Sequence, residues 1–144
     1  MEIARAPRRM TSLPSWLLAQ AATASGRTVA AALASTGAHR TEFAVLTALD
    51  ESGPLSQAGL SDTVGLDRSD MVRLLDRLAE QGMVVREPDP ADRRRNRIAL
   101  TKAGRTRLRT LDGAVADAQD EVTARLSDAE RDRLVSLLRK LLGA

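Results

Sequence analysis

The sequence contains no cysteine and no tyrosine, and its 144 residues include only one histidine, one tryptophan and one phenylalanine. Without cysteine the chain has no disulfide bond, no thiolate metal ligand, no cysteine nucleophile and no sensor based on thiol oxidation. A lone histidine is a poor zinc site, because zinc takes four protein ligands, or three and a water. We therefore expect neither a metal site nor another cofactor.

The signatures of common enzyme sites are missing as well. His39 has no recognisable arrangement of serine and aspartate beside it, so nucleophilic catalysis has no visible apparatus. Gly53, Gly59 and Gly65 are scattered and match neither the G-x-G-x-x-G nor the P-loop spacing. We therefore predict that the protein is not an enzyme.

Long uninterrupted apolar segments are also absent. The stretch MEIARAPRRMTSLPS is basic and lacks the apolar core of a signal peptide. Residues 16 to 34 are apolar but are interrupted by Gln20, Ser25, Gly26 and Arg27. A chain of this length fits one domain, residues 1–144. We expect a single-domain cytoplasmic protein that does not enter a membrane.

Positive charge is present but unevenly distributed. The net charge is +3, yet residues 86 to 109 contain nine Lys or Arg against three Asp or Glu, which leaves the rest of the chain net acidic. A basic patch on a nearly neutral protein indicates a polyanionic partner, most often nucleic acid. A solubilising surface is the alternative for a charge run taken alone.

Three helices are predicted in the first half of the chain. Residues 15 to 35 are rich in Ala and Leu, with Ser15 as the N-cap and Gly37 as the stop. Residues 41 to 51 form a second helix, which ends at Gly53. Residues 56 to 64 form a short third helix, which Gly65 ends.

The fourth predicted helix, within LDRSDMVRLLDRLAEQG, has two distinct faces. Asp67 is its cap and Gly82 its terminator. An apolar stripe at i, i+3, i+4 and i+7 consists of Met71, Leu74, Leu75 and Leu78. At about 100° per residue the opposite face is centred on Ser69 and Arg73, with Val72 and Asp76 beside them. One face therefore belongs to the core, and the other presents short polar, basic and methyl-bearing groups.

The pattern changes after Gly82 to that of strands. MVVREP and NRIALT alternate and are rich in β-branched residues, while DPADRR between them contains turn formers. This indicates a two-stranded ribbon with arginines at its tip. A helix then begins near Thr101.

The C-terminal region is predicted to be helical and to pair with other helices. A heptad-like stripe consists of Leu108, Leu111, Val115, Ala118 and Val122. Ser127 and Glu130 fit a capping box for a last helix striped by leucines 134, 138 and 141. The heptad can pack within one chain, but the wide apolar faces of the first and last helices favour a homodimer.

This order of elements predicts a winged helix-turn-helix fold, mainly α with a small β-hairpin wing. Residues of about 37–101 form the DNA-binding region, and residues of about 12–36 and 102–144 form the dimerisation helices. With the fourth helix in a major groove, the hairpin reaches phosphates or the adjacent minor groove, whose negative potential attracts arginine.

The chain resembles the MarR family of bacterial transcriptional regulators. The stretch from Asp92 to Thr101 has the family's D-x-R wing signature followed by L-T, with Gly104 three residues on. Upstream, SDMVRLLDRLAEQGMVVRE resembles the recognition helix running into the first wing strand. The resemblance implies a two-fold dimer that binds double-stranded DNA at pseudo-palindromic operators, as a repressor.

The resemblance also implies roles in the wing. Arg94 resembles the arginine that enters the minor groove, and Asp92 the acidic residue that orients the wing through an ion pair, for which Arg77 is a candidate partner. The remaining predicted wing contacts are Arg93, Arg95 and Arg97.

Ser69, Asp70 and Arg73 match recognition-helix positions. There Arg73 can bond a guanine, Val72 can touch a thymine methyl, and Arg68 is a phosphate contact. A surface ion pair of Arg73 with Asp70 or Asp76 remains open.

Many members of the family bind small aromatic acids or phenols in a cleft between the dimerisation and DNA-binding regions. Trp16, His39 and Phe43 lie in segments that resemble its walls, although a core tryptophan and a histidine at a helix entry are the alternative. Two other functions stay open: a regulator without a small-molecule effector, and a dimeric interaction protein that has lost DNA binding.

Overall fold

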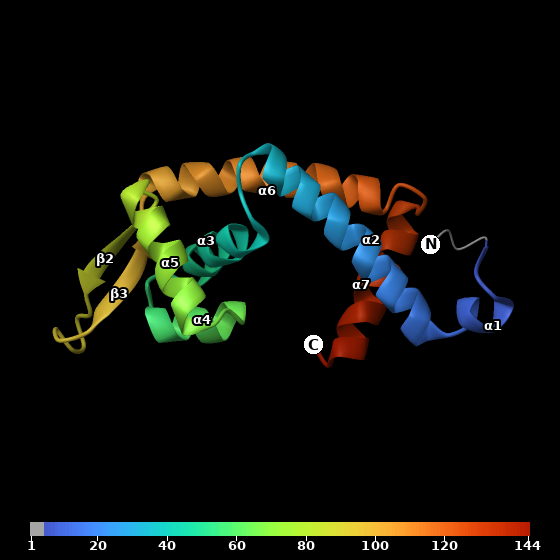
Figure 1. The fold of residues 1–144 in the computed structure, drawn as a ribbon, viewed down its shortest axis with the longest axis horizontal. Coiled ribbons are helices and arrows are strands. Elements are labelled where there is room, and N and C mark those ends of the chain that lie inside the picture. The colour runs from blue at the N-terminus through green and yellow to red at the C-terminus, as the bar shows by residue number, and fades with distance from the viewer. Residues whose placement is uncertain (1–4) are drawn as a thin grey trace. The chain divides into compact units, whose positions relative to one another are not determined.

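The computed structural model describes residues 5–144, which form two compact units (Figure 1). One unit comprises the chain up to Ala31 together with Ala116–Ala144, and the other comprises Ala32–Val115. We call them the terminal unit and the central unit. Two long helices, α2 (Pro14–Ser35) and α6 (Lys102–Val122), belong partly to each.

The central unit contains three complete helices and a small sheet. Its helices are α3 (Arg40–Ser52), α4 (Gln57–Val64) and α5 (Arg68–Glu80), and its strands are β1 (Leu55–Ser56), β2 (Val84–Pro88) and β3 (Asn96–Leu100). The predicted helices and both predicted strands are therefore confirmed to within one or two residues. Gly65 and Gly82, at the ends of α4 and α5, have φ of 70° and 71°, a left-handed conformation that glycine adopts without strain.

The predicted ribbon has a third strand. The strands follow the order β1-β3-β2, and both pairings are antiparallel, with Val84 opposite Leu100 and Leu55 opposite Ile98. The prediction of a two-stranded ribbon was therefore wrong by one strand. Because β1 has only two residues, it is too short to show the alternation that identifies a strand.

Apolar side chains from α3, α4, α5, β2 and β3, together with α6, form the core of the central unit. The predicted stripe of α5 is confirmed, since all four of its side chains are buried. Other fully buried members are Val45, Leu46, Leu60, Ile98 and Leu111. Figure 1 shows the hairpin of β2 and β3 projecting beyond these helices, with its loop at the far end.

A close backbone contact joins the wing to α6. The Thr101 hydroxyl donates to the Gly82 carbonyl at 2.6 Å and accepts from the Gly104 amide at 3.0 Å. A Cβ on Gly104 would lie 2.1 Å from the carbonyl oxygen of Met83, so only glycine fits there. The L-T and glycine positions of the wing signature thus fix where the hairpin ends and the helix begins.

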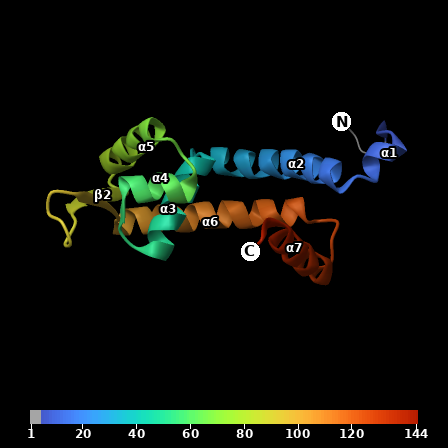
Figure 2. The same cartoon turned by 90° about the horizontal axis from the view of Figure 1, so that it is seen from below.

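The terminal unit contains α1 (Arg8–Thr11), most of α2, the end of α6 and α7 (Asp128–Leu142), whose arrangement Figure 2 shows from a second side. The predicted capping box is present at Ser127 and Glu130. Ser15 is not the N-cap of α2, because the helix begins one residue earlier, at Pro14. Proline suits a first helical position, where its missing N–H would have no partner.

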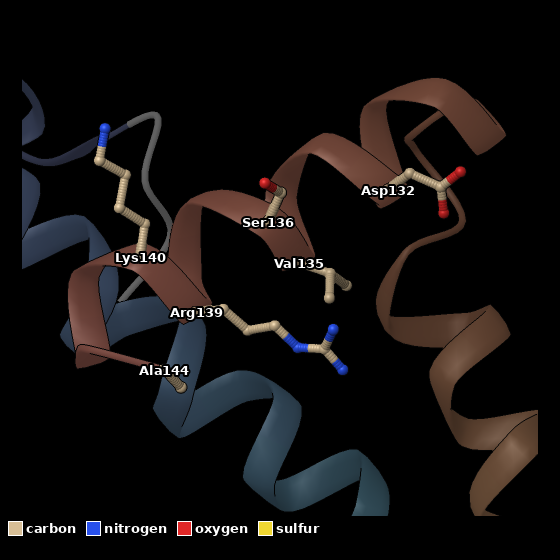
Figure 3. A pocket seen from close by; sticks show the side chains of 6 residues that line it. All are labelled: Asp132, Val135, Ser136, Arg139, Lys140 and Ala144. Carbon is tan, nitrogen blue, oxygen red and sulfur yellow. The ribbon is translucent and has the colours of Figure 1, made fainter.

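Apolar surface remains uncovered in the terminal unit. Side chains from α2, α6 and α7 line a hollow of about 840 Å³. Exposed apolar residues include Leu134, Val135, Leu137, Leu141 and Leu142. A second hollow, of about 500 Å³, runs along α7 beside Val135 and Arg139 (Figure 3).

The heptad of α6 is used mainly within the chain. Leu108, Leu111 and Ala118 are buried in the single chain, whereas Val122 remains 38% exposed. The preference for a seam across a dimer was thus wrong for most of this stripe. None of the helices that the structure describes has the length and apolar character needed to cross a membrane.

Candidate nucleic-acid interface

The start of α5 is fixed by the carboxylate of Asp67. This carboxylate accepts from the Asp70 amide at 2.9 Å and from the Ser69 hydroxyl at 2.7 Å. The two hydrogen bonds, that from the amide first, lower the pKa of Asp67 below its ordinary value because they stabilise the charged form. The Asp67 cap therefore orients the first turn of α5 and binds the hydroxyl hydrogen of Ser69.

The face of α5 opposite the core is open to solvent, as predicted. Ser69, Val72, Arg73, Asp76 and Arg77 are all exposed. Val72 retains 38% of its accessible surface, which leaves a methyl-bearing group available for contact. Arg68, at the first position of the helix, is also exposed.

Arg73 forms an ion pair with Asp70, one of the two partners that the sequence left open. The arginine side chain is still 76% exposed. A guanidinium carries five N–H donors, and this contact occupies only part of them. Asp70 therefore directs Arg73 along the surface of the helix while leaving donors free for another acceptor.

Two ion pairs neutralise the base of the wing. Arg86 of β2 contacts Asp76 of α5 at 2.5 Å, and Arg97 of β3 contacts Glu87 of β2 at 2.7 Å. The second pair joins residues that lie directly opposite in the strand register. Arg86 thus links the wing to α5, and Arg97, a predicted DNA contact, has its Nε occupied within the hairpin.

The tip of the wing is built around Asp92. Its Oδ1 accepts from the backbone amide of Arg94 at 3.1 Å and from its Nε at 3.3 Å, and its Oδ2 lies 3.7 Å from Nε of Arg95. The Asp89 amide donates to the Arg95 carbonyl at 2.9 Å, which closes the loop. Asp92 therefore shapes the turn from which the arginines project.

The arginines at this tip are almost fully exposed. The side chains of Arg94 and Arg95 keep 93% and 80% of their accessible surface. Arg93 is exposed too, and among residues 5–144 its side chain has no hydrogen bond or ion pair. The most exposed guanidinium groups of the hairpin therefore lie at its end.

The proposed pairing of Arg77 with Asp92 is wrong. Asp92 contacts residues of its own turn, whereas Arg77 lines a hollow of about 360 Å³ between α5 and the start of α3. The other lining residues are His39, Thr41, Leu66, Asp70, Arg73 and Leu74. The sequence did not indicate the actual partners of Asp92, Arg94 and Arg95, because a carboxylate in a short turn can be satisfied by donors of the same turn.

The three residues predicted to line a ligand cleft lie in different units. Trp16 is half-buried in the terminal unit, whereas His39 and Phe43 belong to the central unit. His39 is the exposed N-cap of α3, and its side chain makes no capping hydrogen bond. Neither Trp16 nor Phe43 lines the hollow beside His39.

A buried ion pair within the central unit was not predicted. Arg107 of α6 donates from Nε to Glu42 of α3 at 2.9 Å and from Nη1 to the Thr36 carbonyl at 2.9 Å. Glu42 is buried, because it lies on the same face of α3 as Leu46 and Leu49. That spacing is the signal in the sequence: a carboxylate on an apolar stripe requires a cationic partner.

Comparison with known proteins agrees with this geometry. The model of the MarR family matches residues 36–95, from before α3 to the tip of the wing. A relative from Thauera aromatica, named as a candidate transcriptional regulatory protein for the hcr operon, is 36% identical over 99 residues, which are 69% of this chain and 60% of that protein. In sequence, the chain is thus similar to the MarR family over the central unit.

Solved structures of MarR-family regulators cover nearly the whole chain. The apo form of wild-type MarR from E. coli has a TM-score of 0.79 and 26% identity, covering 90% of this chain and 97% of its own. CouR from Rhodococcus jostii RHA1, in its complex with p-coumaroyl-CoA, has a TM-score of 0.76 and 29% identity, covering 94% and 95%. The winged-helix fold predicted from the sequence is thus confirmed.

Proposed function

We propose that this protein is a sequence-specific DNA-binding regulator of the MarR family that represses transcription from pseudo-palindromic operators. The observation that carries the proposal is the distribution of charge in the wing. Arginines at its base are paired with carboxylates, whereas Arg93, Arg94 and Arg95 at its tip are exposed. Arg94 and Arg95 contact Asp92 of their own turn but keep 93% and 80% of their side-chain surface exposed, against 35% and 32% for Arg86 and Arg97 at the base. A hairpin with its most exposed guanidinium groups at its end is suited to reach phosphates or a minor groove.

The recognition helix supplies the base contacts in this proposal. Val72 offers methyl groups to a thymine, and Arg73 offers a guanidinium to guanine O6 and N7. Asp70 holds Arg73 in place before binding, which limits the side-chain entropy lost on binding. Arg68, at the start of the helix, contacts a phosphate.

A second copy of the chain is the partner that fits the terminal unit. The exposed leucines of α7 and the apolar hollow of about 840 Å³ lie in this unit, and an interface between two copies would cover them. A two-fold dimer would present its recognition helices to successive major grooves about 34 Å apart. Multi-angle light scattering should give twice the mass of one chain, and the mass of a single chain would contradict the dimer.

A small aromatic or phenolic ligand is the effector that we infer. The supporting observation is that CouR, which is similar over nearly the whole chain, was solved with p-coumaroyl-CoA bound. Such a ligand releases DNA only if it binds the free and DNA-bound conformations with different affinity. A ligand screen that finds no effector while operator binding is intact would favour regulation without one.

The test of DNA binding is a salt titration on the promoter DNA beside the protein's own gene. Arg94→Ala should weaken binding by about tenfold or more and lower the slope of log K against log salt by about 0.9 for each phosphate that the variant no longer neutralises. Arg27→Ala, which removes an exposed charge from α2, is the matched control and should change neither quantity. Equal behaviour of the two variants would contradict the wing assignment, and absence of specific binding by the wild type would favour an interaction protein.

A further inference from the structure

We propose that the hollow between the start of α3 and α5 is a phosphate-binding site, which holds the DNA backbone on the side of α5 away from the wing. This inference rests on the proposed function and deepens it. It assigns His39 and Arg77 to the same backbone phosphate. Their partner is thus a phosphodiester group, an oxyanion with two acceptor oxygens.

The position of the hollow on α5 is the first argument. At about 100° per residue, Asp70 and Arg77 lie roughly 80° to 100° to one side of Ser69, whereas Val72 lies roughly 60° to the other side. Asp76, which binds the wing through Arg86, lies on that other side as well. The hollow and the wing therefore flank the exposed face of α5 on opposite sides.

The dimensions of DNA make both flanks relevant. A helix with its side chains is about 10 to 12 Å across, and the major groove is about 12 Å wide. A helix that enters the groove therefore lies between two rows of phosphates. The arginines of the wing extend toward one row, and the hollow faces the other.

The side chains of the hollow have donors without acceptors. Among the described residues, Arg77 has no hydrogen bond or ion pair through its side chain, and the imidazole of His39 does not cap α3. The carboxylate that lines the hollow, that of Asp70, is already paired with Arg73. An excess of positive charge with free N–H groups thus faces the hollow.

Apolar side chains complete the site. Leu66 and Leu74 line the hollow together with the charged groups, and Leu74 belongs to the buried core. Electrostatic attraction is stronger beside such low-dielectric surface than in open water. Arg77 differs from Arg86, Arg97 and Arg107 of the same unit, each of which has a carboxylate oxygen within 2.9 Å.

The experiment uses a duplex that the wild-type protein selects from a random pool. Copies of this duplex carry an uncharged methylphosphonate at one backbone position at a time, and their affinities are measured for the wild type, Arg77→Ala, His39→Asn and the Arg27→Ala control. Asparagine is chosen because it is a good N-cap residue, so α3 is preserved. Circular dichroism confirms that each variant is folded.

For the wild type and Arg27→Ala, a methylphosphonate should lower affinity about tenfold at each phosphate that the protein contacts. In each half-site, one of these phosphates should lie on the side of α5 away from the wing. In Arg77→Ala the loss at that position should disappear, while the losses at the phosphates that the wing binds persist. Its salt slope should be lower by about 0.9. His39→Asn should reduce the loss at the same position by several-fold.

An identical methylphosphonate profile for the wild type and Arg77→Ala would overturn the inference and leave the proposed function intact. If the wild type selects no sequence, the proposed function and the inference fail together. Inorganic phosphate and benzoate are titrated separately to test free anions as occupants. Binding of either that is abolished in Arg77→Ala, with the DNA profile unchanged, would show that the hollow serves a small anion and not the DNA backbone.

Discussion

Replacing Arg107 by alanine should destabilise the central unit strongly, although this arginine belongs to the basic stretch from which DNA binding is inferred. Its guanidinium neutralises Glu42 and also bonds the Thr36 carbonyl, each at 2.9 Å. The Glu42 side chain is only 5% exposed and that of Arg107 is 20% exposed. The substitution therefore leaves a buried carboxylate and a carbonyl without their partner.

The magnitude follows from the burial of the pair. Breaking a buried ion pair by removing one member costs roughly 3 to 5 kcal/mol, because the remaining charge is uncompensated. Some water reaches the arginine, so a loss of about 2 to 4 kcal/mol is expected here. Replacing both members with leucine should cost much less, because no charge is then left buried.

The assay is urea unfolding followed by far-ultraviolet circular dichroism at one fixed protein concentration. Fluorescence is less suitable, because Trp16, the only tryptophan, lies in the terminal unit. A shift in the midpoint at an unchanged m value reports stability. Comparing Arg107→Leu, Glu42→Leu and the double leucine variant gives the coupling between the two residues.

A loss of less than 1 kcal/mol in Arg107→Ala would refute this reasoning. Reduced affinity for DNA without a loss of stability would show instead that Arg107 acts in binding. The second result would move Arg107 from the structural residues to those of the interface.

Two further predictions concern Gly104, where the wing meets α6, and Glu130, at the start of α7. Gly104→Ala should lower stability by roughly 1 to 3 kcal/mol, because the added Cβ would lie 2.1 Å from the Met83 carbonyl oxygen; a melting temperature equal to that of the wild type would contradict the close contact. The Ser127 amide and hydroxyl lower the pKa of Glu130 below its ordinary value of 4.5, so Glu130 stabilises α7 above that pH and loses this effect as the pH falls through its lowered value. Stability measured from pH 7 to pH 3 should therefore decline more in the wild type than in Glu130→Gln, and parallel curves would show that the capping box does not contribute.

Elements with strong periodicity could be predicted from the sequence alone. The apolar stripe from Met71 to Leu78 indicated both the existence of α5 and the face that it exposes, because burial follows the helical repeat. The caps at Asp67 and Ser127 were recognisable because they depend on residues only three positions apart. Local chemistry of this kind does not depend on the tertiary fold.

Long-range pairings were beyond the same reasoning. The partner of Glu42 lies 65 residues away, and the two-residue strand β1 exists only because β3 is there to pair with it. The partner of Asp92 was misassigned for the opposite reason, since Arg94 and Arg95 are its neighbours in the turn. Which of several arginines reaches a given carboxylate depends on backbone geometry that composition and spacing do not contain.

The structure divides the basic stretch into two groups with different consequences for mutation. Arg86, Arg97 and Arg107 are held by carboxylates within the central unit, so their replacement should act first on the fold. Arg93 and Arg94 extend from the wing tip into solvent, and the contact of Arg94 with Asp92 leaves its side chain 93% exposed, so their replacement should act on binding with little effect on stability. The excess of charge seen in the sequence therefore overstates the number of DNA contacts, because part of it balances carboxylates of the fold. Measuring stability and salt-dependent affinity on the same variants separates the two groups.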